Sequence, residues 1–321
     1  MSANVAIPIA GFKDVYHVNA VEKALHELPA SANEALRAVY EKMVRLGGQR
    51  FTVKPSALPE MDALFDELPN FTEVLEDIRK HIALCIDSND SVELPPMLLL
   101  GEPGIGKTHF ARKLSQLLGT GFGFVPMSSL TAGWVLSGAS SQWKNAKPGK
   151  VFDTFVNGDY ANPVIVVDEI DKASAEGQYD PLGALYELLE VQTATRFVDE
   201  FVELPIDASG AVWLATANDA ARIPEPLVSR LAVYEIEAPD AEGAARIART
   251  IYSEIRGAHD WGRQFPETLS SSVLDKLGTL PPREMRRAIH SAFGNAKIAG
   301  RTEVGPDDIQ DPRARKQRIG F

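Results

Sequence analysis

An eight-residue segment, GEPGIGKT at residues 101–108, constrains the fold of this 321-residue chain more than any other feature. It places Gly101, Gly106, Lys107 and Thr108 at the spacing of a phosphate-binding loop, in which glycines let backbone N–H groups wrap the phosphates. The apolar run 97–100 precedes the segment and a helical pattern at 108–118 follows it. A strand–loop–helix context of this kind also directs the positive end of the helix toward the phosphates.

The segment predicts that this chain binds ATP together with Mg²⁺. We expect the Lys107 ammonium group on the β- and γ-phosphate oxygens, and the Thr108 hydroxyl in the shell of the magnesium ion. The expected nucleotide-binding residues are Gly101, Glu102, Pro103, Gly104, Ile105, Gly106, Lys107, Thr108 and His109.

A second feature is the acidic pair Asp168 and Glu169, which directly follows the apolar run 164–167. A strand of this composition is buried in mid-sheet, and its carboxyl end carries both acids to the edge where a phosphate loop lies. Asp168 suits a role on the magnesium ion, and Glu169 is placed to polarise an attacking water molecule. Two acids at a strand end are often plain solvated surface. About 60 residues beyond a phosphate loop, we favour the catalytic interpretation.

Two further polar residues have ordinary interpretations beside the functional ones. Asn218 follows the apolar run 212–215, where it is a candidate for holding the attacking water, although an Asn after a strand is usually a turn former. Arg230 lies far along the sequence from the loop, and taken alone it is best interpreted as part of a surface salt bridge.

From residue 96 onward, short apolar runs alternate with helical patterns. The runs have the length of buried parallel strands, and they are Met97–Leu100, Phe122–Met127, Val164–Val167, Val212–Ala215 and Val233–Ile236. They predict an α/β fold with a parallel sheet covered by helices. After Pro239 the strands stop, and residues 241–256, 270–277 and 283–298 are predicted as helices of a small all-α domain. The expected division is 1–68, 69–239 and 240–321.

The first 68 residues are expected to form a small, mainly helical accessory region. Ser31 and Glu34 have the spacing of a capping box, which predicts a helix that runs to Leu46 and ends at the glycines 47 and 48. A short strand is expected at 50–54. Asn70 and Glu73 form a second such pattern, which predicts a helix that runs to about residue 86.

Composition and charge exclude several classes of protein. The 33 basic and 44 acidic residues give a net charge of −11, which disfavours broad nucleic-acid binding. The single cysteine, Cys85, excludes an internal disulfide and a cysteine-rich metal site. No run of about 18 apolar residues occurs and no signal peptide is evident, so we expect a cytoplasmic protein without membrane spans.

The segments GEPGIGKT, VIVVDEIDKA, WLATAN and IPEPLVSRL, in this order, resemble the AAA+ superfamily, and most of all the ATPase module of Lon proteases. The resemblance is most specific from residue 136 to 236, where LSGASSQWKNAKPGK is similar to the Lon pore-loop segment. It implies an AAA+ sheet followed by a helical lid. It also implies a ring of subunits, most often a hexamer.

The resemblance also assigns residue roles. Asn218 matches the sensor-1 position, and Arg230 matches the arginine finger, which reaches the ATP of the neighbouring subunit. Arg283 best matches the sensor-2 arginine of the lid, with Arg287 one helical turn on as the alternative. Glu169, Asn218, Arg230 and Arg283 are therefore the expected catalytic residues, and Thr108 and Asp168 the expected metal ligands.

The chain departs from Lon in two respects. It ends at residue 321, shortly after the lid helices, so we expect no peptidase domain. The pore-loop position of Lon usually reads aromatic–aliphatic–glycine, and here it reads Trp143, Lys144 and Asn145. The leading hypothesis is a non-proteolytic motor that remodels a protein partner through a central pore. The alternatives are a nucleic-acid motor or loader, for which the loop lysines Lys144, Lys147 and Lys150 speak, and a nucleotide-timed scaffold for an effector complex.

Overall fold

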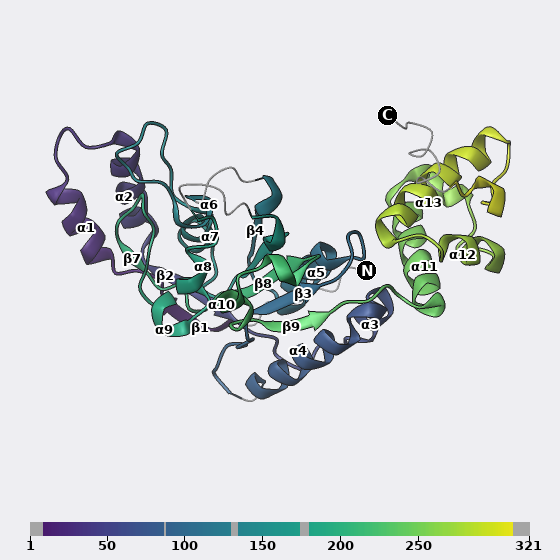
Figure 1. Ribbon diagram of the computed structural model, residues 1–321, viewed down its shortest axis with the longest axis horizontal. Coiled ribbons are helices and arrows are strands. Elements are labelled where there is room, and N and C mark those ends of the chain that lie inside the picture. Colours follow the sequence, from purple (N-terminus) through teal and green to yellow (C-terminus); the bar gives the residue numbers. More distant parts are fainter. Residues whose placement is uncertain (1–8, 87, 130–133, 174–179, 311–321) are drawn as a thin grey trace. The chain divides into compact units, whose positions relative to one another are not determined.

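The computed structural model describes residues 9–86, 88–129, 134–173 and 180–310 (Figure 1). Four basic residues near the C-terminus, which the sequence suggests form a basic tail, lie outside these ranges: Arg313, Arg315, Lys316 and Arg318. The chain divides into two compact units. The first comprises the described parts of 1–59, 76–100 and 111–235, and the second those of 60–75, 101–110 and 236–321. Helices α4 (Thr72–Cys85) and α5 (Lys107–Leu118) each begin in the second unit and end in the first. The division at 68 and 239 stays a prediction.

A five-stranded parallel sheet organises the first unit (Figure 1), as the alternation of strands and helices predicts. In spatial order the strands are β4 (Phe122–Pro126), β5 (Val164–Asp168), β8 (Val212–Ala217), β3 (Met97–Leu100) and β9 (Ala232–Glu235). All neighbouring strands run parallel. Every residue of β8 is buried, and so is every residue of β5 except its last, which explains why both strands are almost continuously apolar.

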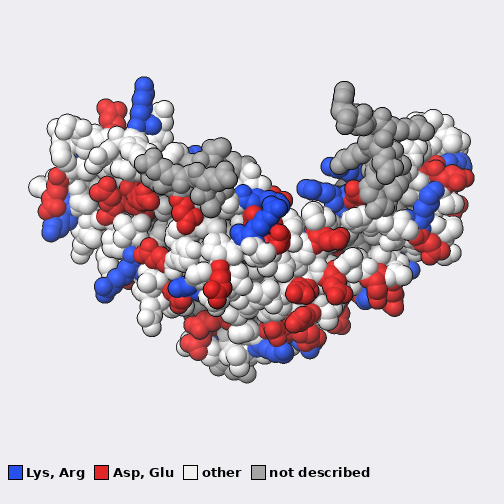
Figure 2. Space-filling view, viewed as in Figure 1, with Lys and Arg blue, Asp and Glu red and all other residues white. Residues whose placement is uncertain are grey.

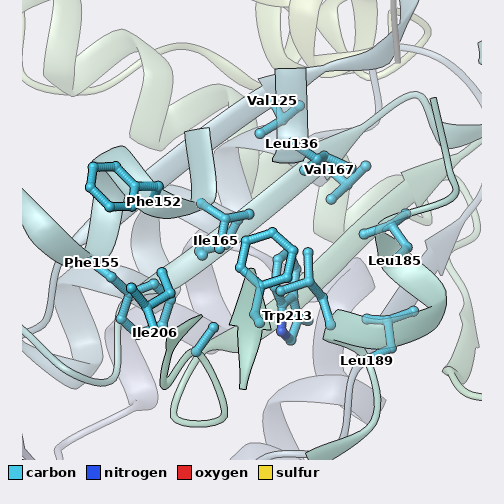
Figure 3. Close-up of a cluster of buried hydrophobic side chains, with 14 of the residues drawn as sticks. Val125, Leu136, Phe152, Phe155, Ile165, Val167, Leu185, Leu189, Ile206 and Trp213 are labelled. Carbon is cyan, nitrogen blue, oxygen red and sulfur yellow. The ribbon is translucent and has the colours of Figure 1, made fainter. Parts of the chain in front are cut away.

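The main hydrophobic core joins the sheet to neighbouring helices (Figure 3). Ile165 and Val167 of β5 and Trp213 of β8 lie in one cluster with Phe152 and Phe155 of α7 (Lys150–Val156). Fully burying a side chain of this size contributes about 1.5–3 kcal/mol to folding. The shorter elements of the unit are α6 (Trp134–Ser137), α8 (Leu185–Leu188), α9 (Val191–Ala194), β6 (Phe197–Val198), β7 (Pro205–Ile206) and α10 (Glu225–Val228).

The N-terminal region belongs to the same unit. β1 (Ile9–Asp14) pairs antiparallel with β2 (Gln49–Val53), and α1 (Val18–Glu27) and α2 (Glu34–Leu46) lie between them in sequence. Tyr40 and Met43 of α2 are buried in the main core. Arg50 of β2 is buried and donates to the last carbonyl groups of α7, from Nε to Phe155 O at 3.1 Å and from Nη2 to Val156 O at 2.5 Å. The sequence predicts α2 and β2 but does not reveal β1 or α1.

The predicted capping box at Ser31 is wrong. The N-cap of α2 is Asn33, whose Oδ1 accepts a hydrogen bond from the N–H of Ala35 at 2.9 Å. An Asn that directly precedes the first turn satisfies a free N–H group of that turn, so the helix begins at Glu34.

The second predicted capping box is also wrong. Asn70 lies in a short 3-10 turn before α4, and its Nδ2 donates to Ile105 O at 3.4 Å and to Glu237 O at 3.2 Å. The amide group therefore fixes two loops of the second unit, and α4 begins at Thr72.

The second unit is helical, as expected, with α3 (Asp62–Glu67), α11 (Ala241–Ala258), α12 (Ser271–Leu277) and α13 (Pro282–Ile298). Asp240 begins α11, because its Oδ1 accepts from the N–H of Gly243 at 2.7 Å. The core of the unit includes Tyr252 and Phe293, whose rings stack with centroids 5.0 Å apart. Of the helices that the structure describes, none is both long and apolar enough to span a bilayer.

Candidate functional site

The candidate site begins at the carboxyl-terminal edge of the sheet. The register pairs the last residue of β3, Leu100, with Ala217 at the end of β8, and β8 pairs with β5 up to Val167. The three strands therefore end at the same edge, where ligands of parallel sheets usually bind. The acidic pair ends β5 at this edge, and the glycine-rich loop follows β3 directly in the chain.

A buried threonine of β8 connects the two acidic residues. Thr216 is 1% exposed, and its hydroxyl donates to Asp168 Oδ1 at 2.8 Å. The Thr216 hydroxyl oxygen in turn accepts a hydrogen bond from the backbone N–H of Glu169 at 2.9 Å. Thr216 therefore orients the side chain of one acid and the backbone of the other. The sequence did not assign Thr216 a role. A polar residue within an otherwise apolar strand could have indicated that its side chain has a hydrogen-bonding partner.

Glu169 has an unusual backbone conformation. Its φ and ψ are 55° and 50°, in the left-handed region that few non-glycine residues adopt. Such a conformation costs about 1–3 kcal/mol and persists where surrounding contacts enforce it. The hydrogen bond from Glu169 N–H to Thr216 is one of these contacts.

Asn218 lies one residue beyond β8, at the same edge. Its backbone N–H donates to Asp171 Oδ2 at 3.2 Å, and the Asp171 side chain is fully buried. Lys172 Nζ lies 3.5 Å from the same carboxylate oxygen. Asp171 therefore fixes the turn that carries Asn218, a function that the sequence did not assign to it.

The glycine-rich loop lies in the second unit, and its backbone carbonyl groups bind the side chain of Lys107. Lys107 is 8% exposed, and its Nζ donates to Gly101 O at 2.6 Å and to Glu102 O at 3.0 Å. Gly104 and Gly106 have φ values of +86° and +110°, which side chains disfavour. The lysine ammonium is thus placed within the curve of the loop.

Close contacts surround the glycines of the loop. A Cβ atom at Gly101 would lie 2.3 Å from Ile236 O, so only glycine is accommodated there. Behind the loop, Phe71 and Phe110 stack with ring centroids 4.8 Å apart, and the Phe71 ring lies 3.6 Å from the Cβ position of Gly106. Among the described residues, no three His, Cys, Asp or Glu side chains gather as metal ligands.

Two other expected site residues differ in their surroundings. The Nε2 atom of His109 lies 2.7 Å from Glu67 Oε1, so its ring is engaged by a carboxylate of the same unit. At the start of α13, the N–H of Arg283 donates to Gly104 O at 3.3 Å, which places this residue against the loop. Arg287 instead lines a groove between α11 and α13. The backbone of Arg283 thus contacts the loop, and which of the two arginines acts as the sensor stays a prediction.

Arg230 follows α10 in the first unit and is engaged within its own chain. Its Nε lies 2.9 Å from Glu190 Oε1, and its guanidinium carbon lies 5.9 Å from the ring centre of Tyr186. Its side chain is 30% exposed. The surface salt bridge that the sequence suggested is therefore present, and Glu190 is the partner that sequence reasoning did not identify.

The loop that carries Trp143 is partly exposed. Trp143 is 40% exposed, and its ring packs edge-on against Trp134 with centroids 5.5 Å apart. Asn145 adopts a left-handed φ of 64°.

A buried carboxylate holds the base of this loop. Asp199 Oδ2 accepts from Gly149 N–H at 2.7 Å, and Oδ1 accepts from Phe201 N–H at 2.9 Å and Val202 N–H at 3.3 Å. Burial raises the pKa of Asp199 to about 6, although these three bonds oppose the shift.

Residues 97–237 match the family described as "ATPase family associated with various cellular activities (AAA)". The chain is 30% identical over 205 residues to Lon protease 2 of Herpetosiphon aurantiacus. The matched segment covers 64% of this chain and 25% of that protein. It is 35% identical over 157 residues to the Lon protease of Metamycoplasma arthritidis, covering 49% of this chain and 19% of that protein. The matched part is thus a quarter or less of the length of these two relatives.

Solved structures share the fold. The Hsp104:casein complex of S. cerevisiae in an extended conformation superposes with a TM-score of 0.59, covering 77% of this chain and 50% of that chain at 14% identity. The Thermotoga maritima RuvB Holliday junction branch migration motor gives a TM-score of 0.51, covering 78% of this chain and 70% of that chain at 14% identity. At this identity, the two likenesses concern the fold alone.

Proposed function

Residues 97–237 form an AAA ATPase domain similar in sequence to that of Lon proteases, and we propose that this chain hydrolyses ATP as a ring-forming motor that remodels protein partners. The observation that carries the proposal is the sheet edge. There the acid pair of β5 is held by Thr216, and the lysine-bearing loop leaves the adjoining end of β3.

Each residue of the site has a chemical role in this proposal. Lys107 binds the β- and γ-phosphates, and Thr108 and Asp168 hold the magnesium ion, which when bound neutralises charge on the phosphate oxygens. Glu169 accepts a proton from the water that attacks the γ-phosphorus, as the bond to the ADP oxygen breaks. Asn218 orients this water. The products are ADP and phosphate.

Two arginines complete the proposal. Arg283, beside Gly104, faces the phosphates from the lid as the sensor-2 residue. Arg230 stabilises the transition state on a neighbouring subunit, since a cation near the γ-phosphate is worth about 1,000- to 100,000-fold in rate. Its pairing with Glu190 then has to open in the assembled ring.

The test is a pair of substitutions assayed for nucleotide binding and phosphate release. Lys107→Ala should abolish ATP binding, whereas Glu169→Gln should bind ATP but turn over about 100- to 10,000-fold more slowly. Glu235→Gln is the matched control, because this carboxylate ends β9, the edge strand of the same sheet, and is exposed. Parent-like hydrolysis by Glu169→Gln would refute the assignment.

Protein is the polymer that we favour as substrate. The curated relatives are proteases, which act on protein, and this chain has a net charge of −11. On the face drawn in Figure 2, acidic and basic side chains are interspersed. Trp143→Ala should preserve basal hydrolysis but abolish remodelling. Retained remodelling would exclude threading past this residue and would favour a nucleotide-timed scaffold.

A nucleic-acid motor is the second candidate, because Lys144 and Lys147 lie in the loop that carries Trp143. The third lysine counted for it, Lys150, is already paired with Asp153 at 2.8 Å. Hydrolysis that is stimulated by DNA or RNA, with a salt dependence weakened by Lys144→Glu, would establish this alternative.

A further inference from the structure

The first unit contains a pocket that has no part in the nucleotide site. Its volume is about 490 Å³, and residues of α2 in the N-terminal region and of the helices α6 and α7 line it. Sites for specific ligands commonly measure about 300–1,000 Å³. Helix α2, which lies outside the residues matched to the AAA family, thus forms one wall of this pocket.

The floor of the pocket is apolar. Met43 of α2 and Phe152 and Val156 of α7 line it, with exposures of 0%, 2% and 1%. Val39 of α2 and Val135 of α6 also line the pocket and are half-buried. An apolar side chain of a ligand would therefore leave water on entering this pocket, which is the main favourable term in such binding.

The rim of the pocket is basic. Lys42, Lys147 and Lys150 line it together with one carboxylate, Asp153. That carboxylate is already neutralised, because Lys150 Nζ donates to it at 2.8 Å and Asn157 Nδ2 at 2.7 Å. Within the described part of the chain, no ion pair engages Lys42 or Lys147. The Lys42 charge also acts on Asp153, but the three lysines outnumber this single carboxylate, so the mouth of the apolar pocket carries a net positive charge that suits anionic groups.

The pocket is also connected to the loop of the candidate pore. Trp134 lines the pocket, is 37% exposed, and packs edge-on against Trp143 at 5.5 Å. A ligand held here thus lies next to the aromatic pair whose outer member we assign to substrate contact.

We propose that this pocket binds a segment of a partner protein in which a large apolar side chain is flanked by carboxylates. The apolar side chain packs on Met43 and Phe152, and the flanking carboxylates pair with Lys42 and Lys147. Nucleic acid fits less well, since its phosphates would need a continuous basic track, whereas the lining of this pocket is largely apolar. The proposal concerns binding and does not depend on ATP hydrolysis.

The experiment uses a fluorescein-labelled peptide with one Phe between acidic residues, titrated with the full chain without nucleotide and followed by anisotropy. We expect a dissociation constant on the order of 10 µM. Lys42→Glu and Lys147→Glu should each weaken binding by about 3- to 10-fold, as expected for reversing an exposed ion pair. Arg45→Glu is the matched control, because this residue lies on the same helix α2 but does not line the pocket, and it should change binding less than about twofold.

Three results would overturn the proposal. A peptide with Ser in place of Phe that binds equally well would show that charge alone attracts it. Equal binding by the parent and by both lysine variants would place the peptide elsewhere. A single-stranded oligonucleotide that displaces the peptide and loses affinity in the same variants would identify a nucleic-acid surface. Since Lys107→Ala should bind the peptide like the parent, a failure of the ATPase proposal is distinguishable from a failure of this one.

Discussion

Thr216→Val should lower the rate of ATP hydrolysis by about 10- to 100-fold and leave ATP affinity nearly unchanged. The Thr216 hydroxyl is the group that joins the acid pair, since it donates to Asp168 at 2.8 Å and accepts from Glu169 N–H at 2.9 Å. Valine has the same shape but neither donates nor accepts a hydrogen bond. The substitution therefore tests the hydrogen bonds rather than the packing.

The magnitude follows from these two bonds. Thr216 is 1% exposed, so water does not readily replace the lost hydroxyl. A buried group that loses its partner costs about 1–3 kcal/mol, and Glu169 N–H is such a group. The left-handed backbone of Glu169 relaxes once this bond is gone. A displacement of a catalytic group by about 1 Å costs about 100-fold in rate, or nearly 3 kcal/mol at 1.36 kcal/mol for each tenfold.

The assay is steady-state phosphate release together with a nucleotide affinity and a melting curve for each variant. Thr216→Ser keeps the hydroxyl and should stay within about threefold of the parent rate. If Thr216 acts through Glu169, adding Thr216→Val to Glu169→Gln should slow hydrolysis little further, because the two changes share one interaction. A folded Thr216→Val protein with the parent kcat would refute the reasoning, as would full additivity of the two changes.

Three further expectations concern single side chains. Arg230→Ala should bind ATP but hydrolyse it poorly, and an excess of Lys107→Ala subunits should restore part of its activity; a fully active Arg230→Ala protein would refute action across subunits. Arg50→Ala should lower the free energy of unfolding in urea by about 2–4 kcal/mol, because it removes buried charge-assisted hydrogen bonds to the carbonyl groups of α7. An unchanged urea midpoint of unfolding would show that other contacts hold the N-terminal region. Burial raises the pKa of Asp199 to about 6, above its unfolded value, so its contribution to stability is fully present below about pH 4 and is lost as pH rises through 6. Between pH 7 and pH 5 the parent should gain about 1 kcal/mol over Asp199→Asn in urea unfolding, and identical pH dependences in the two proteins would contradict this.

The sequence predicted the parts of the fold that follow from local pattern. Each of the five parallel strands was expected within one or two residues of its observed limits. The central strands β3, β5 and β8 are buried on both faces and therefore have continuous apolar runs, whereas the edge strands β4 and β9 are only partly buried but still consist largely of apolar residues. The helices α11, α12 and α13 were expected for the same kind of reason, since each repeats apolar residues at helical spacing. β1 has no such pattern, and it is fixed by its pairing with β2 about 40 residues away.

In the candidate site, too, the sequence predicts the residues of local motifs but not the distant residues that position them. The identities of Lys107, Asp168 and Glu169 follow from short motifs with a chemical reason. The partners that position them do not, because Thr216 lies 48 residues from Asp168 and is brought to it only by the pairing of β5 with β8. Glu190 is joined to Arg230 across 40 residues by the packing of α8, α9 and α10, which sequence periodicity does not record.

The loop at Trp143 differs from the loop usual in Lon at two positions, Lys144 and Asn145, and the structure bears on the second of them. Asn145 replaces the glycine usual in Lon, and the sequence suggested a loss of backbone freedom. In the structure Asn145 adopts φ 64°, a left-handed conformation that Asn tolerates better than most residues. A left-handed turn therefore forms at this position without glycine. The chemical difference from Lon rests on Lys144, whose charge stands next to the exposed Trp143 ring. A substrate that passes this loop would meet an aromatic surface and a cation, which suits extended segments carrying both apolar and acidic side chains.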